Sequence, residues 1–363
     1  MTADRITNGS SRTEEGDGPG GGEIVRGLSL GARQAEGPLA VFPLFAQQNG
    51  GADEAAGAAT APPSYVTLRQ ALRAGDAVIT EVSEGGSVPE LQVVNKGGER
   101  ILVLDGEELH GAKQNRVLSV SMLIDAHTTQ IVPVSCTEQG RWSYDSREFT
   151  ESEVLAERQV RYSMRGSSHA AMRSGAPVHA DQGAVWGLVE ALHDRQQTHS
   201  PTSAMRDAYD AKKHDLDRLL AAFPLVDGQN GVLVLHGSRV VGCDFVSRAP
   251  QYAELHDKLL RSYAFEALVR GGEPGERPQA EAFLERISAL RGERFKSPGL
   301  GWDVRFQGGG VLGSALEYRG HVVHAAFFDV GGAGGSTEDP GSEQRRGWRI
   351  ADARERARRR QGR

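Results

Sequence analysis

The sequence predicts an α+β fold, with a β-rich and mostly antiparallel N-terminal half, central helices and a mixed α/β C-terminal part. Three observations favour it. Short apolar runs separated by Gly-containing turns fill residues 39–135, helix-like stretches follow between residues 150 and 223, and paired strand-like runs return after residue 230. Because strands and helices come in blocks and do not alternate, this order favours α+β over a doubly wound parallel sheet.

The first elements follow a polar N-terminal segment. Residues 1–35 are rich in Gly and polar side chains, and we expect them to be disordered. Residues 39–45 predict a first strand, in which Pro43 favours an edge position or a bend. After a Gly- and Ala-rich loop, residues 67–72 predict a short helix with Thr67 as its N-cap. The next strands are predicted at 77–82, 90–95, 101–104, 117–124 and 130–135.

Helices are predicted for the middle of the chain. The capping-box pattern over residues 150–153 predicts a helix that ends near Met164. Gly237-Ser238 is a two-residue turn signal and predicts a hairpin of strands 231–236 and 239–245. Periodicity and turn residues predict further helices at 181–195, 205–223, 252–268 and 278–290, and further strands at 302–307, 313–318 and 321–328.

The length of 363 residues suggests one large or two medium domains. We expect residues 36–330 to form one α+β domain, or two subdomains that divide it into a β-rich part (36–148) and a mixed part (149–330). Residues 331–363 are Gly-rich and then Arg-rich, and we expect a disordered, solubilising tail. As the alternative, this tail binds nucleic acid or an acidic partner.

Composition narrows the class of protein. The net charge of −6 does not indicate nucleic-acid binding by the chain as a whole. The only two cysteines, Cys136 and Cys243, have no zinc-ligand spacing and do not make a disulfide scaffold. The N-terminus lacks the apolar region of a secretory signal, and no stretch approaches the ~18 consecutive apolar residues of a membrane span. We therefore expect a cytoplasmic protein that does not bind membranes.

Three carboxylates lie around a glycine directly after the strand at 101–104. They are Asp105, Glu107 and Glu108, and on a strand-like backbone Glu107 and Glu108 point to opposite sides. A carboxylate that faces a pocket can act as a general acid or base, and nearby His110 would carry protons or only donate a hydrogen bond. The alternative is a solvated turn.

Two positions in this segment have the spacing of metal ligands on a helix. Glu107 and His110 are three residues apart, but Gly106 and Gly111 bracket them and argue against a helix. We therefore predict no metal ligand, and a metal-dependent hydrolase is the weakest alternative. The sequence contains no Walker A loop and no GxGxxG after a strand, so no cofactor is indicated.

A basic and amide-rich run follows. Lys113, Gln114, Asn115 and Arg116 suit recognition of a polar, anionic ligand, because Arg clamps phosphate or carboxylate and amides bond a ribose or base. A second polar segment after the strand at 130–135 contains Glu138, Arg141 and Trp142, and its Arg would converge with the first set. In the alternative, Arg116 and Arg141 pair with Glu107, Glu108 or Glu138 in a structural network.

Three other residues allow a functional and a structural interpretation. Cys136 would be a nucleophile if His110 were its base, and a buried, inert thiol is favoured. Trp142 would stack on a base or sugar, whereas a core or rim aromatic is favoured. Asp244 is interpreted as an acid at the end of a strand.

The two polar segments carry a family resemblance. DGEELHGAKQNR (105–116) and VSCTEQGRW (134–142) resemble the signature of the ARG-and-rhodanese-phosphatase-associated protein domain, a bacterial family of unknown biochemistry. The resemblance extends over roughly residues 38–330. It implies a link to ADP-ribose or nucleotide metabolism, and it assigns no catalytic residue.

Two functions from different classes follow. The first is a hydrolase-like enzyme acting on a nucleotide-like small molecule. The second is a non-catalytic module that senses such a ligand or docks a partner. In the first, the catalytic residues are Glu107, Glu108 and His110, and the ligand-binding residues are Lys113, Gln114, Asn115, Arg116, Glu138, Arg141 and Trp142.

Overall fold

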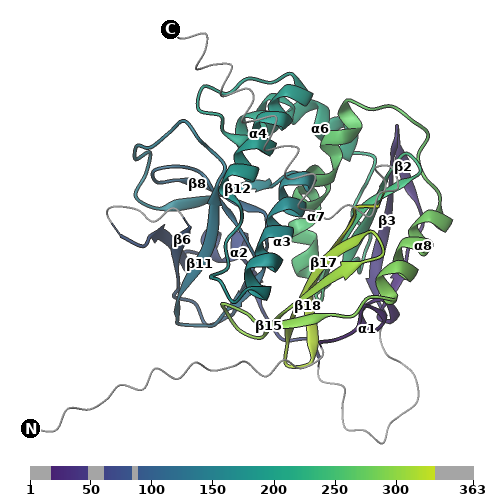
Figure 1. Cartoon of the computed structure of the whole chain (residues 1–363), viewed down its shortest axis with the longest axis horizontal. Coiled ribbons are helices and arrows are strands. Elements are labelled where there is room, and N and C mark those ends of the chain that lie inside the picture. Colours follow the sequence, from purple (N-terminus) through teal and green to yellow (C-terminus); the bar gives the residue numbers. More distant parts are fainter. Residues whose placement is uncertain (1–17, 48–60, 84–88, 332–363) are drawn as a thin grey trace, which may run out of the picture.

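The computed structural model describes residues 18–47, 61–83 and 89–331 (Figure 1). It confirms the α+β class and the mostly antiparallel pairing. Within the segment predicted to be disordered, residues 21–36 instead form a helix and two strands, so that prediction is wrong there. The remaining predictions of disorder, for residues 1–17 and 332–363, lie outside the described residues.

A nine-stranded antiparallel sheet forms one side of the fold. The predicted edge position of the strand with Pro43 is wrong, because this strand lies inside the sheet. Two short strands pair with this strand along the chain before and after Pro43, one with residues 39–41 and the other with residues 44–46. Pro43 lies between these two pairings, where its missing N–H is tolerated. In spatial order the strands are β1 (Leu28–Leu30), β3 (Leu39–Ala46), β13 (Gly231–His236), β14 (Arg239–Val246), β18 (His321–Asp329), β17 (Val311–Tyr318), β16 (Trp302–Gly308) and β15 (Glu293–Lys296), and β2 (Gln34–Glu36) pairs with β3.

A six-stranded and a three-stranded sheet form the β-rich part. The predicted strand at 117–124 is instead two strands, because its start pairs with β8 and β11 and its end pairs with β7. The six strands are β12 (Phe149–Leu155), β8 (Glu107–Gly111), β9 (Arg116–Leu118), β11 (Thr129–Cys136), β6 (Glu90–Asn95) and β5 (Ala77–Glu81), and the three are β10 (Met122–Ile124), β7 (Ile101–Val103) and β4 (Val66–Thr67).

The helices confirm some sequence signals and correct others. The capping-box prediction at 150–153 is wrong, because these residues pair with β8 as strand β12. The helix begins later, at Arg158, and continues to Arg173, beyond the predicted end near Met164. Thr67 is the N-cap that the sequence predicts, and the helix predicted to begin at Asp181 has this residue as its N-cap. The helices are α1 (Gly21–Arg26), α2 (Leu68–Ala74), α3 (Arg158–Arg173), α4 (Gln182–Gln196), α5 (Met205–Ala211), α6 (Lys213–Leu220), α7 (Ala249–Ala264), the 3-10 turn η1 (Phe265–Leu268) and α8 (Arg277–Ser288).

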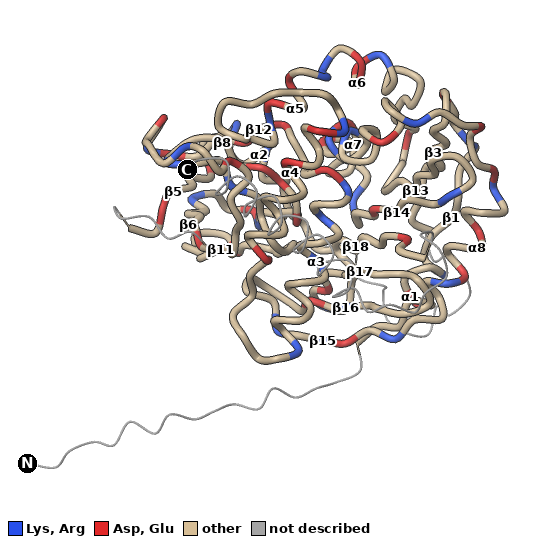
Figure 2. The backbone as a smooth tube through the Cα atoms, turned by 45° about the horizontal axis from the view of Figure 1, so that its top comes forward, with Lys and Arg blue, Asp and Glu red and all other residues tan. Residues whose placement is uncertain are grey.

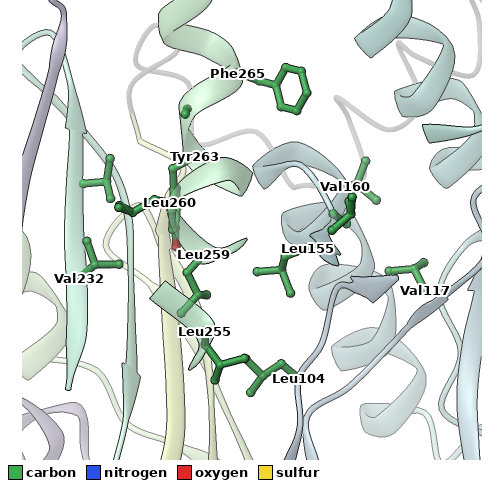
Figure 3. Packing of buried hydrophobic residues seen from close by; sticks show 14 of the residues in the cluster. Leu104, Val117, Leu155, Val160, Val232, Leu255, Leu259, Leu260, Tyr263 and Phe265 are labelled. Atoms are coloured by element: carbon green, nitrogen blue, oxygen red, sulfur yellow. The ribbon is translucent and has the colours of Figure 1, made fainter. Parts of the chain in front are cut away.

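Three hydrophobic clusters hold these layers together. Helices α3 and α7 lie between the nine-stranded sheet and the β-rich part (Figure 1), and side chains from all three share one core. Figure 3 shows Leu104 and Leu155 of the β-rich part approaching Leu255 and Leu259 of α7. A second cluster joins α1 and α8 to the other face of the nine-stranded sheet, and a third fills the β-rich part.

Charged residues also reach the middle of the fold. Figure 2 shows basic and acidic positions interspersed along the chain, and α7 has both kinds whereas the charged positions of α3 are basic. None of the helices in the described residues has the length and apolar character that a membrane span requires.

Candidate functional site

The two polar segments of the sequence meet in the six-stranded sheet. Strand β8 pairs with β9, and β9 pairs with β11, so that Cys136 lies opposite Arg116. Segment 105–116 thus contains β8 and the start of β9, which are antiparallel. The residues up to Trp142 follow the end of β11, which pairs with β9. Because side chains alternate across a strand, the charged groups divide between an inner set that faces α3 and α7 and an outer set.

The first inner carboxylates are bound to cations on the helices. Glu107 is fully buried, and its Oε1 accepts a hydrogen bond of 2.8 Å from Lys258 Nζ of α7. Its Oε2 accepts from the Leu104 backbone N–H, also at 2.8 Å. Lys258 forms a second ion pair with Glu151 of β12. Glu107 therefore links the β-rich part to α7 and has no exposed oxygen.

Asp105 is held in the same way by α3. Its side chain accepts hydrogen bonds from Ser121 Oγ at 2.8 Å and from Arg165. Burial acts to raise the pKa of Asp105, but Arg165 and Arg161 outweigh it and lower the pKa to about 2. Asp105 is therefore ionised and paired throughout the neutral range.

The third inner carboxylate belongs to Asp244 of β14, which is completely buried. Arg161 donates two hydrogen bonds to it, at 3.0 and 2.6 Å, and the Tyr263 hydroxyl donates a third at 2.6 Å. Despite its burial, the pKa of Asp244 is lowered far below the usual range, mainly by the Arg161 guanidinium. His324 Nε2 lies 3.4 Å from the same carboxylate.

One glycine makes room for this network. Gly106 has a φ of +89°, and a Cβ there would lie 2.8 Å from Arg161 Cγ. The sequence analysis did not identify Arg161, Arg165 and Lys258. The sequence feature that could have indicated them is a basic residue at a helix position whose periodicity places it on the buried face.

Glu108 points to the opposite side of β8, as strand alternation predicts. It is completely buried, and it accepts hydrogen bonds from Thr137 Oγ1 at 2.7 Å and Ser152 Oγ at 3.1 Å. Burial raises its pKa from 4.5 to about 7, although both hydroxyls oppose the rise. The carboxyl therefore takes up its proton near neutral pH.

This raised pKa predicts a pH-dependent stability. Because folded Glu108 holds its proton more tightly than the unfolded chain does, its contribution to the free energy of unfolding falls as pH rises between about 4.5 and 7. We expect the stability of Glu108→Gln relative to the wild type to increase by about 3 kcal/mol over this window. Urea denaturation of both proteins at a series of pH values measures the difference, and parallel curves would contradict the shift.

The outer set begins with a hydrogen-bonded loop. Arg141 donates to Glu138 Oε2 at 2.9 Å, to Asn115 Oδ1 at 3.1 Å and to the Ala112 carbonyl at 2.7 Å. His110 Nδ1 is hydrogen-bonded to the same Asn115 oxygen at 2.9 Å. Burial acts to raise the pKa of Glu138, but its hydrogen bonds, first that of Arg141, outweigh it and lower the pKa. These groups hold the loop after β11 against β8.

Arg116 pairs with Cys136 at the start of this loop and is completely buried. Its Nη1 donates to Gln114 Oε1 at 2.9 Å and to Cys136 Sγ, and its Nη2 lies 3.5 Å from Glu81 Oε1 of β5. Burial raises the pKa of the Cys136 thiol to about 11, so the nucleophilic thiolate is scarce at neutral pH. His110 bonds to Asn115 and not to this thiol.

Aromatic rings and a cation form the exposed end of the outer set. Trp142 and Tyr144 are 52% and 53% exposed. The Lys113 ammonium lies 5.4 Å and 5.0 Å from their ring centroids, and the Arg116 guanidinium lies 5.8 Å from that of Trp142. We call Lys113, Trp142 and Tyr144 the aromatic surface. At its base, His110 Nε2 is 3.5 Å from Asp145.

In the described residues, a metal site is absent and the larger cavity lies outside the two polar segments. No group of three His, Cys, Asp or Glu side chains is placed to hold a metal ion among them. A shallow cavity of ≈ 210 Å³ is lined partly by Asp76, Asn95 and Glu99 and includes no residue of the two polar segments.

Comparison with known families gives one match. The sequence profile of the ARG and Rhodanese-Phosphatase-superfamily-associated Protein domain matches residues 27–328 and confirms the resemblance of the two polar segments. No curated protein and no solved structure matches the chain.

Proposed function

Because the chain belongs to the ARG and Rhodanese-Phosphatase-superfamily-associated Protein domain family, we propose that it is a non-catalytic module that binds a nucleotide-like ligand on the aromatic surface. The ring of the ligand stacks on Trp142 and Tyr144, and Lys113 pairs with its phosphate. The family resemblance is the basis for an ADP-ribose or nucleotide ligand. The side chains of Lys113, Trp142 and Tyr144 are the basis for placing this ligand on the aromatic surface.

One observation carries this proposal. The carboxylates of segment 105–116 are enclosed, and two of them are already paired with Arg165 and Lys258, whereas the rings of Trp142 and Tyr144 face solvent beside Lys113. An exposed indole beside an ammonium group suits base stacking and phosphate pairing, and each stacked base contributes about 1–3 kcal/mol.

A hydrolase is the second candidate, and Glu108 favours it. A carboxyl with a pKa of about 7 suits general acid–base chemistry at neutral pH. The same carboxyl is completely buried between Thr137 and Ser152, so a substrate would reach it only after the loop that follows β11 moves.

Binding by calorimetry tests the proposal. We expect ADP-ribose or an adenine nucleotide to bind, and Trp142→Ala to weaken binding about 10-fold or more because the stacking platform is lost. Trp302→Ala is the matched control. The Trp302 indole also lies against a cation, with the Arg294 guanidinium 4.4 Å from its ring centroid, but it belongs to β16 and not to the aromatic surface. Lys113→Ala should weaken the nucleotide more than the nucleoside.

Two results would contradict the binding module. Equal affinity in wild type and Trp142→Ala would place the ligand elsewhere. Turnover of the bound ligand that is abolished in Glu108→Gln, with affinity retained, would favour the hydrolase.

A further inference from the structure

Two buried side chains below Trp142 have polar atoms without hydrogen-bond partners. Arg116 is 0% exposed, and its Nε and Nη2 have no hydrogen-bond partner among the described residues. The side chain of Glu81 is 5% exposed, and neither of its carboxylate oxygens has one there. The closest approach between the two groups is 3.5 Å, from Nη2 to Oε1.

These atoms form a complementary set. Arg116 offers two N–H donors and Glu81 two carboxylate acceptors, and the approach of Nη2 to Oε1 is slightly longer than a hydrogen bond. Buried polar atoms are rarely left unbonded, and such groups in a native protein indicate a missing partner. The opposite edge of the guanidinium is already used, because Nη1 donates to Gln114 and Cys136.

We infer that Arg116 and Glu81 bind the vicinal diol of a ribose, which makes the ligand a ribonucleoside derivative. This inference rests on the proposed function. Each hydroxyl of a diol donates one hydrogen bond and accepts another. When the Arg116–Glu81 pair opens to admit the diol, one hydroxyl accepts from Nη2 and donates to one Glu81 oxygen, and the other accepts from Nε and donates to the second oxygen.

The charges at this position favour a sugar over a phosphate. The Glu81 carboxylate would repel an anion placed between it and Arg116, whereas a neutral diol uses both groups. The Lys113 ammonium lies 5.4 Å from the Trp142 ring centroid and 5.0 Å from that of Tyr144, and we assign the phosphate to this cation. Sugar and phosphate thus have separate partners.

Trp142 lies against the Arg116 guanidinium. Its ring lies over the Arg116 guanidinium at 5.8 Å and is half exposed, in a stretch after β11 that has no helix or strand. A ligand therefore enters when the indole shifts aside, and the ring then lies against the sugar or base.

Affinities for matched nucleosides test the inference. The probes are adenosine and 2′,3′-dideoxyadenosine, measured by calorimetry on the full chain. We expect the dideoxy compound to bind at least 10-fold more weakly, because a site built to bond hydroxyls rejects an analogue without them. Glu81→Gln replaces one acceptor by a donor and should reduce this ratio below 3-fold, and Arg116→Lys, which lacks Nε, should do the same.

The control and the other outcomes separate the two proposals. Glu317→Gln is the matched control, since Glu317 also pairs with an Arg beside an indole, at 2.7 Å from Arg294, and its ratio should equal that of the wild type. Equal binding of both nucleosides would overturn the diol site and leave the aromatic surface in place. Failure of both nucleosides and of ADP-ribose to bind would overturn both proposals. Urea melts of each variant exclude misfolding as the cause.

Discussion

Replacing Asp244 by asparagine is expected to reduce the free energy of unfolding by about 3–5 kcal/mol. The carboxylate is completely buried and accepts two hydrogen bonds from Arg161, at 3.0 and 2.6 Å, and one from Tyr263. The substitution leaves the Arg161 charge in the interior without its counter-ion. Since a domain of this kind is stable by about 5–15 kcal/mol, much of its stability would be lost.

Equilibrium urea denaturation measures the loss. The matched control is Asp215→Asn, which breaks an exposed pair with Arg218 at 3.0 Å and should change stability by less than about 1 kcal/mol. An equal, small effect of both substitutions would show that the buried network does not hold the fold together.

Lys258→Met is expected to have a comparable effect, also about 3–5 kcal/mol. Lys258 is 1% exposed and pairs with both Glu107 and Glu151, so its loss leaves two buried carboxylates without this cation. Glu151 still has Arg69 at 3.2 Å, whereas Glu107 keeps, among the described residues, the backbone N–H of Leu104. The double variant Lys258→Met/Glu107→Gln should recover part of the loss.

The loss should grow as pH rises. Burial acts to raise the pKa of Glu151, but Lys258, with Arg69, outweighs it and lowers the pKa. A carboxylate with a lowered folded pKa stabilises the protein above its unfolded pKa and loses that contribution as pH falls. Without Lys258 this contribution shrinks, so the deficit should be larger at pH 8 than at pH 4. A deficit independent of pH would indicate lost packing of the Lys258 stem instead.

Short-range patterns predicted the elements whose signals are local. The Gly237-Ser238 turn gave the β13–β14 hairpin, and Thr67 and Asp181 marked helix starts, because turns and caps are decided by a few neighbouring residues. The capping-box pattern at 150–153 failed because pairing with β8, a partner about 40 residues away, overrode it.

In the candidate site, too, the local sequence predicted some features and distant partners decided others. Strand alternation separated Glu107 from Glu108, and the two polar segments do meet through β9 and β11. The partners Lys258 and Arg165 are 151 and 60 residues away from the acids they pair with, and no local pattern links them. Glu81 was missed for the same reason, because only the sheet brings it to Arg116.

The path of the chain has a consequence for biosynthesis. Residues 39–44 of strand β3 pair with β13, so that Leu39 lies opposite His236, and the β-rich part lies entirely between these two strands in the sequence. During synthesis, one edge of β3 therefore stays unpaired until residues 231–236 leave the ribosome. The β-rich part between them can already collapse by then. Such late, long-range closure slows folding and exposes an edge to misassembly. The nine-stranded sheet is therefore completed only after β13 has been synthesised.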